Sequence, residues 1–203
     1  MTDLVNSPDI ILVWPKGQIL LTPQPIPGYT VQVLTPELDE QWIEIHREAV
    51  PSFPASDLVT WLERYRSLAL KDGILVVTDD STEQPVATAG SIDYDKDGMF
   101  PKGGQLAWVA TVPEHQKHGL ATWLSALVTK RLIDENFENI FLCTGDDLLP
   151  AISVYLRLGY LPCLYASDQP DRWGEICDII QYPYEPHLWP SIKDYLDSSS
   201  TLN

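Results

Sequence analysis

The sequence predicts an α/β fold in a single domain. Its 203 residues are enough for one sizeable core, and 44% hydrophobic with 21% charged residues is ordinary for a globular protein. Segments with the two-residue period of strands alternate along the chain with segments of helical period. One almost wholly apolar strand leads through a short loop into a long amphipathic helix and then another apolar strand. That order indicates a strand–helix–strand crossover within the sheet.

The first half of the chain predicts two strands and two helices. The segment "DIILVW" favours a short extra strand, and residues 28–35 alternate as a strand does. Apolar residues at helical spacing then predict a helix over 38–49 and a second over 58–68, which Ser56 or Asp57 could cap.

The second half predicts a hairpin, the crossover and a closing pair of strands. Residues 73–80 and 85–95 form the hairpin, and residues 105–112 form a strand buried on both faces. A long helix over 119–136 leads to a strand over 139–144 and a short helix over 149–160. We expect "LPCLYA" (161–166) and "GEICDIIQY" (174–182) to be the last two strands.

The charge and the apolar runs exclude several classes of protein. A formal net charge of -16 opposes binding to nucleic acid or to an anionic membrane, although it suits a cationic substrate as well as simple solubility. No apolar run is long enough to span a membrane, and the first residues lack the pattern of a signal peptide. We therefore expect a cytoplasmic protein.

The cysteines and histidines do not predict a metal site. Cys143, Cys163 and Cys177 are odd in number and far apart, so we interpret them as buried small residues. His115 and His118 have H-x-x-H spacing, but no further ligands accompany them.

The segment "VATVPEHQKHGLATWL" indicates an anion site. The first turn of a helix has unpaired backbone N–H groups and the positive end of the dipole, and Gly119 lets a phosphate approach the backbone. Lys117, Lys130 and Arg131 make the stretch basic within an acidic chain. A plain strand–loop–helix connection explains the spacing equally well, so spacing alone leaves both interpretations open.

Two motifs in this half resemble those of the GCN5-related N-acetyltransferase (GNAT) family. "QKHGLA" is similar to its Q/R-x-x-G-x-G/A signature, and "PAISVYLRLGY" to its A-x-x-x-Y-x-x-x-G-F/Y landmark. The matching residues are Gln116, Gly119 and Ala121 in the first motif, and Ala151, Tyr155, Gly159 and Tyr160 in the second. The element order resembles the family over residues 28–182, with the sharp motifs in 109–160.

The resemblance implies a fold and a division of the chain. We expect a GNAT-type mixed central sheet with flanking helices, in which the parallel strands 105–112 and 139–144 splay apart. Residues 1–27 would form an N-terminal extension with a possible extra strand. Residues 28–185 would be the acyltransferase domain and residues 186–203 a C-terminal tail.

The resemblance also implies a donor, acetyl-CoA, and residues that bind it. The backbone of three strand residues would pair with the pantetheine arm, and the loop and first helical turn would hold the pyrophosphate. These cofactor-binding residues are Val109, Ala110, Thr111, Gln116, Lys117, His118, Gly119, Leu120 and Ala121.

Tyr155 is the predicted general acid, which would protonate the leaving thiolate. Its helical spacing alone would favour a core residue. No general base is assigned, because the candidates Glu114, Asp93, Asp95, His46 and Glu48 are each interpreted as solvated surface groups. The sequence departs from the family at Leu148, where an asparagine is frequent, and Gln116 brings no charge where many members carry arginine.

The sequence therefore predicts transfer of an acetyl or similar acyl group to an amine of a small molecule or peptide, by direct attack in a ternary complex. The alternatives are a CoA-binding regulatory module without catalysis and, last, an unrelated nucleotide-binding domain. Trp42, Trp61 and Tyr65 belong to the core or face the acceptor, with Trp61 assigned to the core. We expect a monomer or homodimer.

Overall fold

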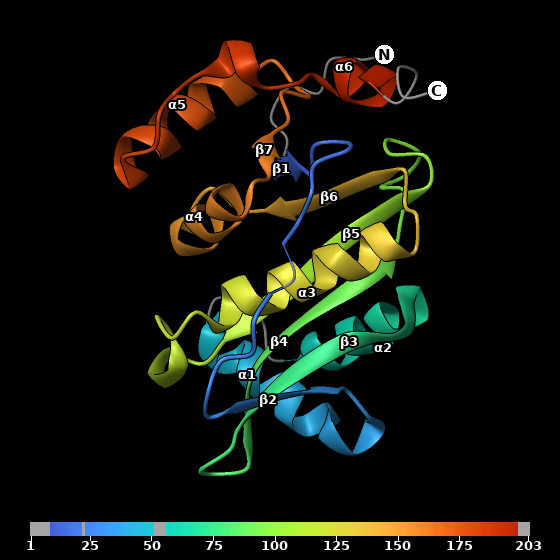
Figure 1. Ribbon diagram of the computed structural model, residues 1–203, viewed down its shortest axis with the longest axis vertical. Helices are drawn as coiled ribbons and strands as arrows, with labels where there is room; N and C mark the ends of the chain where they lie inside the picture. Colours follow the sequence, from blue (N-terminus) through green and yellow to red (C-terminus); the bar gives the residue numbers. More distant parts are fainter. Residues whose placement is uncertain (1–8, 22, 51–55, 199–203) are drawn as a thin grey trace. The chain divides into compact units, whose positions relative to one another are not determined.

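The computed structural model describes residues 9–21, 23–50 and 56–198. Seven strands and six α-helices make up the described chain, so the predicted α/β fold with a mixed sheet and flanking helices is confirmed (Figure 1). The elements are β1 (Ile10–Val13), β2 (Tyr29–Val33), α1 (Asp39–Ala49), α2 (Leu58–Leu68), β3 (Ala69–Asp79), β4 (Gln84–Asp93), β5 (Gly103–Thr111), α3 (Leu120–Asp134), β6 (Asn139–Thr144), α4 (Leu149–Leu158), β7 (Leu161–Pro162), α5 (Gln169–Ile180) and α6 (Ile192–Asp197). Short 3₁₀ helices η1 (Pro36–Leu38), η2 (Pro113–His115) and η3 (Pro186–Leu188) complete them.

The chain divides into two compact units. Unit 1 consists of Met1–Ile19, Asp95–Gly103 and Glu138–Asn203, and unit 2 of Leu20–Tyr94 and Gly104–Phe137. The expected splay between β5 and β6 concerns strands of different units and stays a prediction, as do the domain boundaries. The end of the predicted tail and the segment between the first two helices lie partly outside the described residues.

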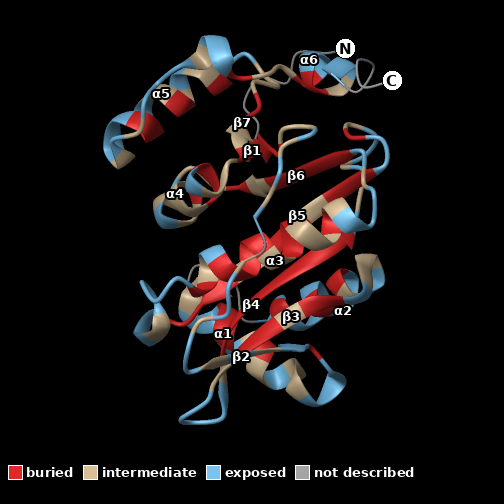
Figure 2. Cartoon of the chain, viewed as in Figure 1, coloured by how far each residue is buried: buried red, intermediate tan, exposed pale blue. Residues whose placement is uncertain are grey.

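The sheet of unit 2 has the order β2-β3-β4-β5, and every pair is antiparallel. Tyr29 lies opposite Asp79 where β2 meets β3, and Gly90 lies opposite Ala107 where β4 meets β5. Strands β4 and β5 are largely buried and β3 in part, whereas no residue of the edge strand β2 is buried (Figure 2).

Helices cover both faces of this sheet. Side chains alternate between the faces of a strand, so Gly104 and Ala107 point to opposite sides. A Cβ on Gly104 would lie 2.6 Å from the ring of Phe137, just beyond α3, whereas Ala107 packs in the cluster that contains Trp42 of α1 and Tyr65 of α2. Helix α3 therefore covers one face, and α1 and α2 cover the other.

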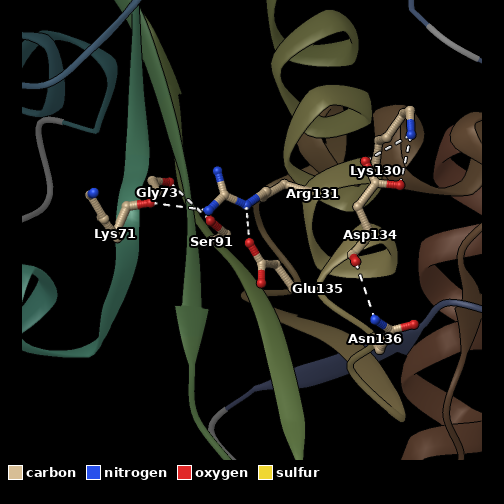
Figure 3. A network of polar contacts seen from close by, with 8 residues as sticks. All are labelled: Lys71, Gly73, Ser91, Lys130, Arg131, Asp134, Glu135 and Asn136. Atoms are coloured by element: carbon tan, nitrogen blue, oxygen red, sulfur yellow. Dashed lines mark hydrogen bonds and ion pairs between the residues drawn. The ribbon is translucent and has the colours of Figure 1, made fainter.

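The C-terminal end of α3 is tied to β3. Arg131 donates from Nη2 to the carbonyl oxygen of Lys71 at 3.2 Å and from Nε to Glu135 at 2.8 Å (Figure 3). Ser91 donates to the carbonyl oxygen of Gly73 at 3.1 Å, beside the irregular part of β3. The bond from Arg131 to Lys71 thus fixes the far end of the helix whose N-terminus carries the predicted anion site.

The sheet of unit 1 has the order β6-β1-β7. The predicted extra strand is confirmed as β1, which is fully buried and pairs antiparallel with both neighbours. In α6, Tyr195 accepts from the backbone N–H of Ile140 at 3.1 Å, and its hydroxyl lies 3.0 Å from the carbonyl oxygen of Trp14. Part of the predicted tail is thus an ordered helix that contacts β6 and Trp14, the residue that follows β1.

Of the two strands predicted near the C-terminal end, one is wrong and the other is correct only in its first two residues. "GEICDIIQY" belongs to α5, in which Trp173, Ile176 and Cys177 share a buried helical face and Pro170 occupies the first turn. The apolar run resembled a strand because those residues stand close together in the sequence. Of "LPCLYA", only Leu161–Pro162 forms a strand, although the N–H of Cys163 still donates to the carbonyl oxygen of Ile11 in β1 at 2.9 Å.

Burial confirms the interpretation of two cysteines. Cys163 and Cys177 are buried and Cys143 is half-buried, and all three are free thiols. Within the described residues, no helix has the length and apolar character needed to cross a membrane.

Candidate functional site

The predicted anion site is built where β5 passes through η2 into α3. The first hydrogen bond of α3 runs from the N–H of Trp123 to the carbonyl oxygen of Gly119 at 2.9 Å. The N–H groups of Leu120, Ala121 and Thr122 come before that bond and have no partner inside the helix. We call residues 116–121 the phosphate loop, because these donors and the positive end of the helix dipole suit an anion.

Two residues of the phosphate loop have left-handed backbone conformations. Lys117 has φ 65° and Gly119, the N-cap of α3, has φ 86°. Such alternation turns successive N–H groups toward one concave side. A side chain at Gly119 would be strained, and its Cβ would lie 3.5 Å from Ile26.

The end of β5 presents a polar group suited to a ligand. The hydroxyl of Thr111 is buried and has no hydrogen-bond partner among the described residues. Gln116 donates from Nε2 to the carbonyl oxygen of Thr111 at 3.3 Å, which ties the start of the phosphate loop to the strand. An orphaned hydroxyl beside a concave row of N–H groups fits the pantetheine and pyrophosphate parts of a CoA molecule.

A second set of side chains supports the loop from β2. The hydroxyl oxygen of Tyr29 lies 3.0 Å from Nδ1 of His115 and 2.7 Å from Nδ1 of His118. His115 places Nε2 3.9 Å from Oδ2 of Asp79. The H-x-x-H pair therefore bonds to a tyrosine, and the described residues contain no group of three or more metal-ligating side chains.

A bulge interrupts β5 just before the predicted pantetheine-binding residues. Gly90 pairs with Ala107 and Thr88 with Ala110, so Trp108 and Val109 together face a single residue of β4. Trp108 has φ 54°, a conformation that is strained for a bulky side chain. The bulge disturbs the regular ladder at Val109, where the resemblance expects the donor to bind.

Aromatic side chains of α1 and α2 pack on the bulge. The ring of Trp108 lies 5.7 Å from Trp42, 5.4 Å from His46, 4.7 Å from Trp61 and 5.9 Å from Tyr65, between centroids. Trp42 and Tyr65 are buried, whereas Trp61 is 38% exposed. Assigning Trp61 to the core was therefore wrong: its ring is exposed to solvent while it makes a T-shaped contact with Trp108.

His46 is not the solvated group that we expected. It is 2% exposed, and its ring packs against that of Trp42 at a tilt of 38°, with 3.8 Å between the centroids. Its Nδ1 lies 2.9 Å from the carbonyl oxygen of Trp42. A carbonyl only accepts, so Nδ1 carries the hydrogen. Burial lowers the pKa of His46 to about 4, although the nearby carbonyls of Trp42 and Trp108 oppose that shift. The Trp108 carbonyl is close enough to act electrostatically but makes no hydrogen bond of normal geometry with Nε2.

Tyr155 belongs to unit 1. It is 6% exposed on α4, with its ring 6.3 Å from that of Tyr160. Burial raises the pKa of Tyr155 well above its usual range, so the phenol keeps its proton at neutral pH. Gly159, with φ 112°, ends the helix, and both Gly159 and Tyr160 donate from the backbone to the carbonyl oxygen of Tyr155.

An ion pair holds the turn before α4, close to the departure from the family at Leu148. Arg172 of α5 binds Asp146 through two bonds, Nε to Oδ2 at 2.8 Å and Nη2 to Oδ1 at 2.5 Å. It also binds Asp168 at 3.2 Å. These carboxylates raise the pKa of Arg172, so the guanidinium remains charged. We call the paired Arg172 and Asp146 the clamp. Sequence reasoning missed it, because two residues of opposite charge that lie far apart in the sequence give no local signal.

The other candidate bases are exposed. Glu114, Asp93, Asp95 and Glu48 all lie on the surface, in agreement with their interpretation as solvated groups. Sequence reasoning also missed Tyr29 and the bulge at Trp108. For Tyr29, the H-x-x-H spacing of its partners was the only signal in the sequence. The bulge at Trp108 gave no signal, because bulges with this backbone conformation usually carry glycine.

Comparisons with known proteins agree with the two motifs. A model of the Acetyltransferase (GNAT) family matches residues 40–160. No curated protein matches the sequence.

Solved structures share the fold. A GCN5-related N-acetyltransferase from Sphaerobacter thermophilus is similar with TM-score 0.61 and 20% identity, over 76% of this chain and 48% of that one. The ribosomal-protein-S18-alanine N-acetyltransferase of Escherichia coli is similar with TM-score 0.53 and 20% identity, over 64% of this chain and 76% of that one. A GCN5-related N-acetyltransferase from Kribbella flavida is similar with TM-score 0.51 and 26% identity, over 77% of this chain and 55% of that one. The chain therefore spans about half the length of the first and third of these structures.

Proposed function

The chain belongs to the GNAT family of acetyltransferases, and on this basis we propose that it transfers an acetyl or similar acyl group from acyl-CoA to an amine. The acceptor would attack the thioester directly in a ternary complex. The observation that carries the proposal is the phosphate loop, with its left-handed Gly119 and unpaired N–H groups at the start of α3. Nothing favours the alternative of an inactive binding module.

The donor would be bound by unit 2. Backbone N–H groups of Gln116 to Ala121, with the side chains of Lys117 and His118, would hold its pyrophosphate. The backbone of Val109, Ala110 and Thr111 would pair with the pantetheine arm, and the hydroxyl of Thr111 would gain a partner there. Acyl-CoA supplies the activated acyl group as a thioester.

Tyr155 would act as the general acid. Its phenol is protonated at neutral pH, as a tyrosine of ordinary pKa also is, and it could give that proton to the departing thiolate. The clamp between Arg172 and Asp146 would hold the turn from which the helix of Tyr155 begins.

The acceptor would be an amine of a small molecule or peptide. The Escherichia coli protein of similar fold is a ribosomal-protein-S18-alanine N-acetyltransferase, which is consistent with a peptide acceptor here. The net charge of -16 favours a cationic amine over an anionic one. We expect the enzyme to act in the cytoplasm as a monomer or homodimer, with residues 28–185 as the acyltransferase domain.

Thermal unfolding with acetyl-CoA, CoA and ATP tests the donor site. A ligand that binds only the folded state raises the free energy of unfolding by about 2.7 kcal/mol when its concentration is roughly a hundred times its Kd. Both CoA species should raise the midpoint of the wild type and ATP should not. Gly119→Glu should fold and lose the response.

Gly98→Glu is the matched control. Gly98 has φ 84° and no atom within 4 Å of an added Cβ, so the substitution brings similar backbone strain and the same charge outside the phosphate loop. It should keep the response to CoA. A wild type that responds to neither CoA species would refute the proposal.

A further inference from the structure

Four polar groups form a row that ends on the phosphate loop. Tyr29 of β2 lies opposite Asp79 of β3, and its hydroxyl reaches Nδ1 of His115 at 3.0 Å and Nδ1 of His118 at 2.7 Å. Nε2 of His115 lies 3.9 Å from the carboxylate of Asp79. The row therefore runs from Asp79 through His115 and Tyr29 to His118.

The number of protons sets the direction of these hydrogen bonds. A phenol has one hydrogen to donate, so it cannot donate to both histidines. Asp79 is ionised at neutral pH like an ordinary carboxyl, and bonds from the backbone N–H and the hydroxyl of Ser81 lower its pKa further. Its negative charge favours a hydrogen on Nε2 of His115, which leaves Nδ1 of that ring as an acceptor.

Tyr29 then donates to His115 and accepts from Nδ1 of His118. Every hydrogen in the row points toward Asp79, and Nε2 of His118 is left with a lone pair. A phosphate oxygen at this nitrogen requires a donor, and a proton taken up at Nε2 would supply one. The resulting imidazolium donates from both nitrogens, one bond to Tyr29 and one to the phosphate.

We propose that Tyr29 is a positioning residue for donor binding, which orients His118 and prepares it to take up a proton and bind a phosphate of acyl-CoA. This inference rests on the proposed function, since the ligand is the same donor. Of the titratable groups, Tyr29 of β2 contacts His118 directly and Asp79 of β3 lies beside His115, while Glu114, His115 and Lys117 belong to the segment of His118 itself. The row through Tyr29 and His115 connects His118 to the carboxylate of Asp79.

Calorimetric titration with CoA at pH 7 tests the inference. Measured in two buffers of different ionisation enthalpy, the wild type should show net proton uptake on binding. Tyr29→Phe removes only the hydroxyl and should raise the Kd for CoA about tenfold, as expected for one charge-assisted hydrogen bond, with reduced proton uptake.

Thr30→Val is the matched control. It deletes a neighbouring hydroxyl on the same strand, which donates to Asp80 at 2.7 Å and does not touch the row. Its Kd and proton uptake should equal those of the wild type. A purely structural role for Tyr29 would lower the midpoint of unfolding and leave the proton uptake unchanged.

His118→Gln supplies a second, independent variant. It should lose the same affinity as Tyr29→Phe, and the double variant should lose little more, because both substitutions break one row. Two outcomes would overturn this inference and leave the proposed function standing. One is that the losses of affinity in the two single variants add in the double variant, and the other is that Tyr29→Phe folds and keeps the Kd and proton uptake of the wild type. A wild type that does not bind CoA would overturn the proposed function with it.

Discussion

The phenol oxygen of Tyr65 occupies the space that a side chain at Gly90 would need. A Cβ on Gly90 would lie 1.7 Å from that oxygen, which donates to the carbonyl oxygen of Ala107 at 3.2 Å across the strand pair. Ala107 directly precedes the bulge at Trp108. The absence of a side chain at Gly90 thus lets α2 supply a hydrogen bond beside the bulge.

Gly90→Ala should therefore destabilise unit 2. The added methyl group must displace a buried tyrosine, and overpacking of this kind costs about 1–3 kcal/mol. Urea unfolding measures the loss. In a Tyr65→Leu background, where the phenol is absent, the same substitution should cost much less. Equal costs in both backgrounds would show that Tyr65 is not the obstacle.

Tyr155→Phe should slow catalysis without preventing donor binding. It removes the proton that the leaving thiolate needs, and general acids contribute roughly 10²-fold or more. Steady-state kinetics should show a fall in kcat of that order with the KM for acyl-CoA nearly unchanged. Tyr184→Phe deletes a hydroxyl that donates to Pro170 elsewhere in unit 1 and should leave kcat as it is. An unchanged kcat in Tyr155→Phe would remove Tyr155 from the mechanism.

His46 should make the protein less stable in mild acid. The buried ring is neutral in the folded state, with a pKa of about 4, and it takes a proton more readily once unfolded, near pH 6.5. The contribution of the neutral His46 ring to the free energy of unfolding is complete above about pH 6.5. It is lost as the pH falls toward 4, by roughly 3 kcal/mol in all. Carboxylates titrate in the same range, so the measurement is the difference between the wild type and His46→Phe.

His46→Phe keeps a flat ring against Trp42 but cannot take a proton. Its free energy of unfolding, followed by urea titration from pH 7.5 to 4.5, should fall less than that of the wild type. Parallel curves for the two proteins would mean that His46 is not held neutral by burial.

The clamp between Arg172 and Asp146 should stabilise unit 1 through one shared interaction. Arg172→Met should lower the free energy of unfolding by about 1–3 kcal/mol, because it leaves the carboxylate without its charged partner. Asp146→Asn should cost a similar amount, and the double variant little more than either one. Losses that add fully would contradict a direct coupling. A lower kcat in folded Arg172→Met would support its influence on the helix of Tyr155.

The sequence predicted the elements whose signals are local. The helical stripe that became α3 and the strand that became β6 were expected within a few residues of their observed ends. The glycine stop at Gly159 was also correct. Periodicity failed in α5, where Ile176 and Cys177 adjoin on a buried helical face and so resemble part of a strand.

The site was predictable only in its backbone part. A loop and glycine before a helix define donors by connectivity alone, whereas Tyr29 and Asp79 come to the loop from other strands of the sheet. The burial of His46 and the exposure of Trp61 depend on how α1 and α2 pack against β5. Packing of that kind places residues far apart in sequence together and leaves no mark on local periodicity.

The position of β1 between β6 and β7 has a consequence for the order in which the protein folds. Ile10 pairs with Thr144, and Leu12 with Pro162, so one strand must wait for partners that a ribosome makes much later. Meanwhile the segment Ile10–Val13 presents four apolar residues without a sheet to join. Unit 2 needs only Leu20–Tyr94 and Gly104–Phe137, and can therefore collapse before unit 1 has all its strands. Pairings this remote along the chain form slowly, so closure of unit 1 is expected to be the late step of folding and the period of greatest exposure to aggregation.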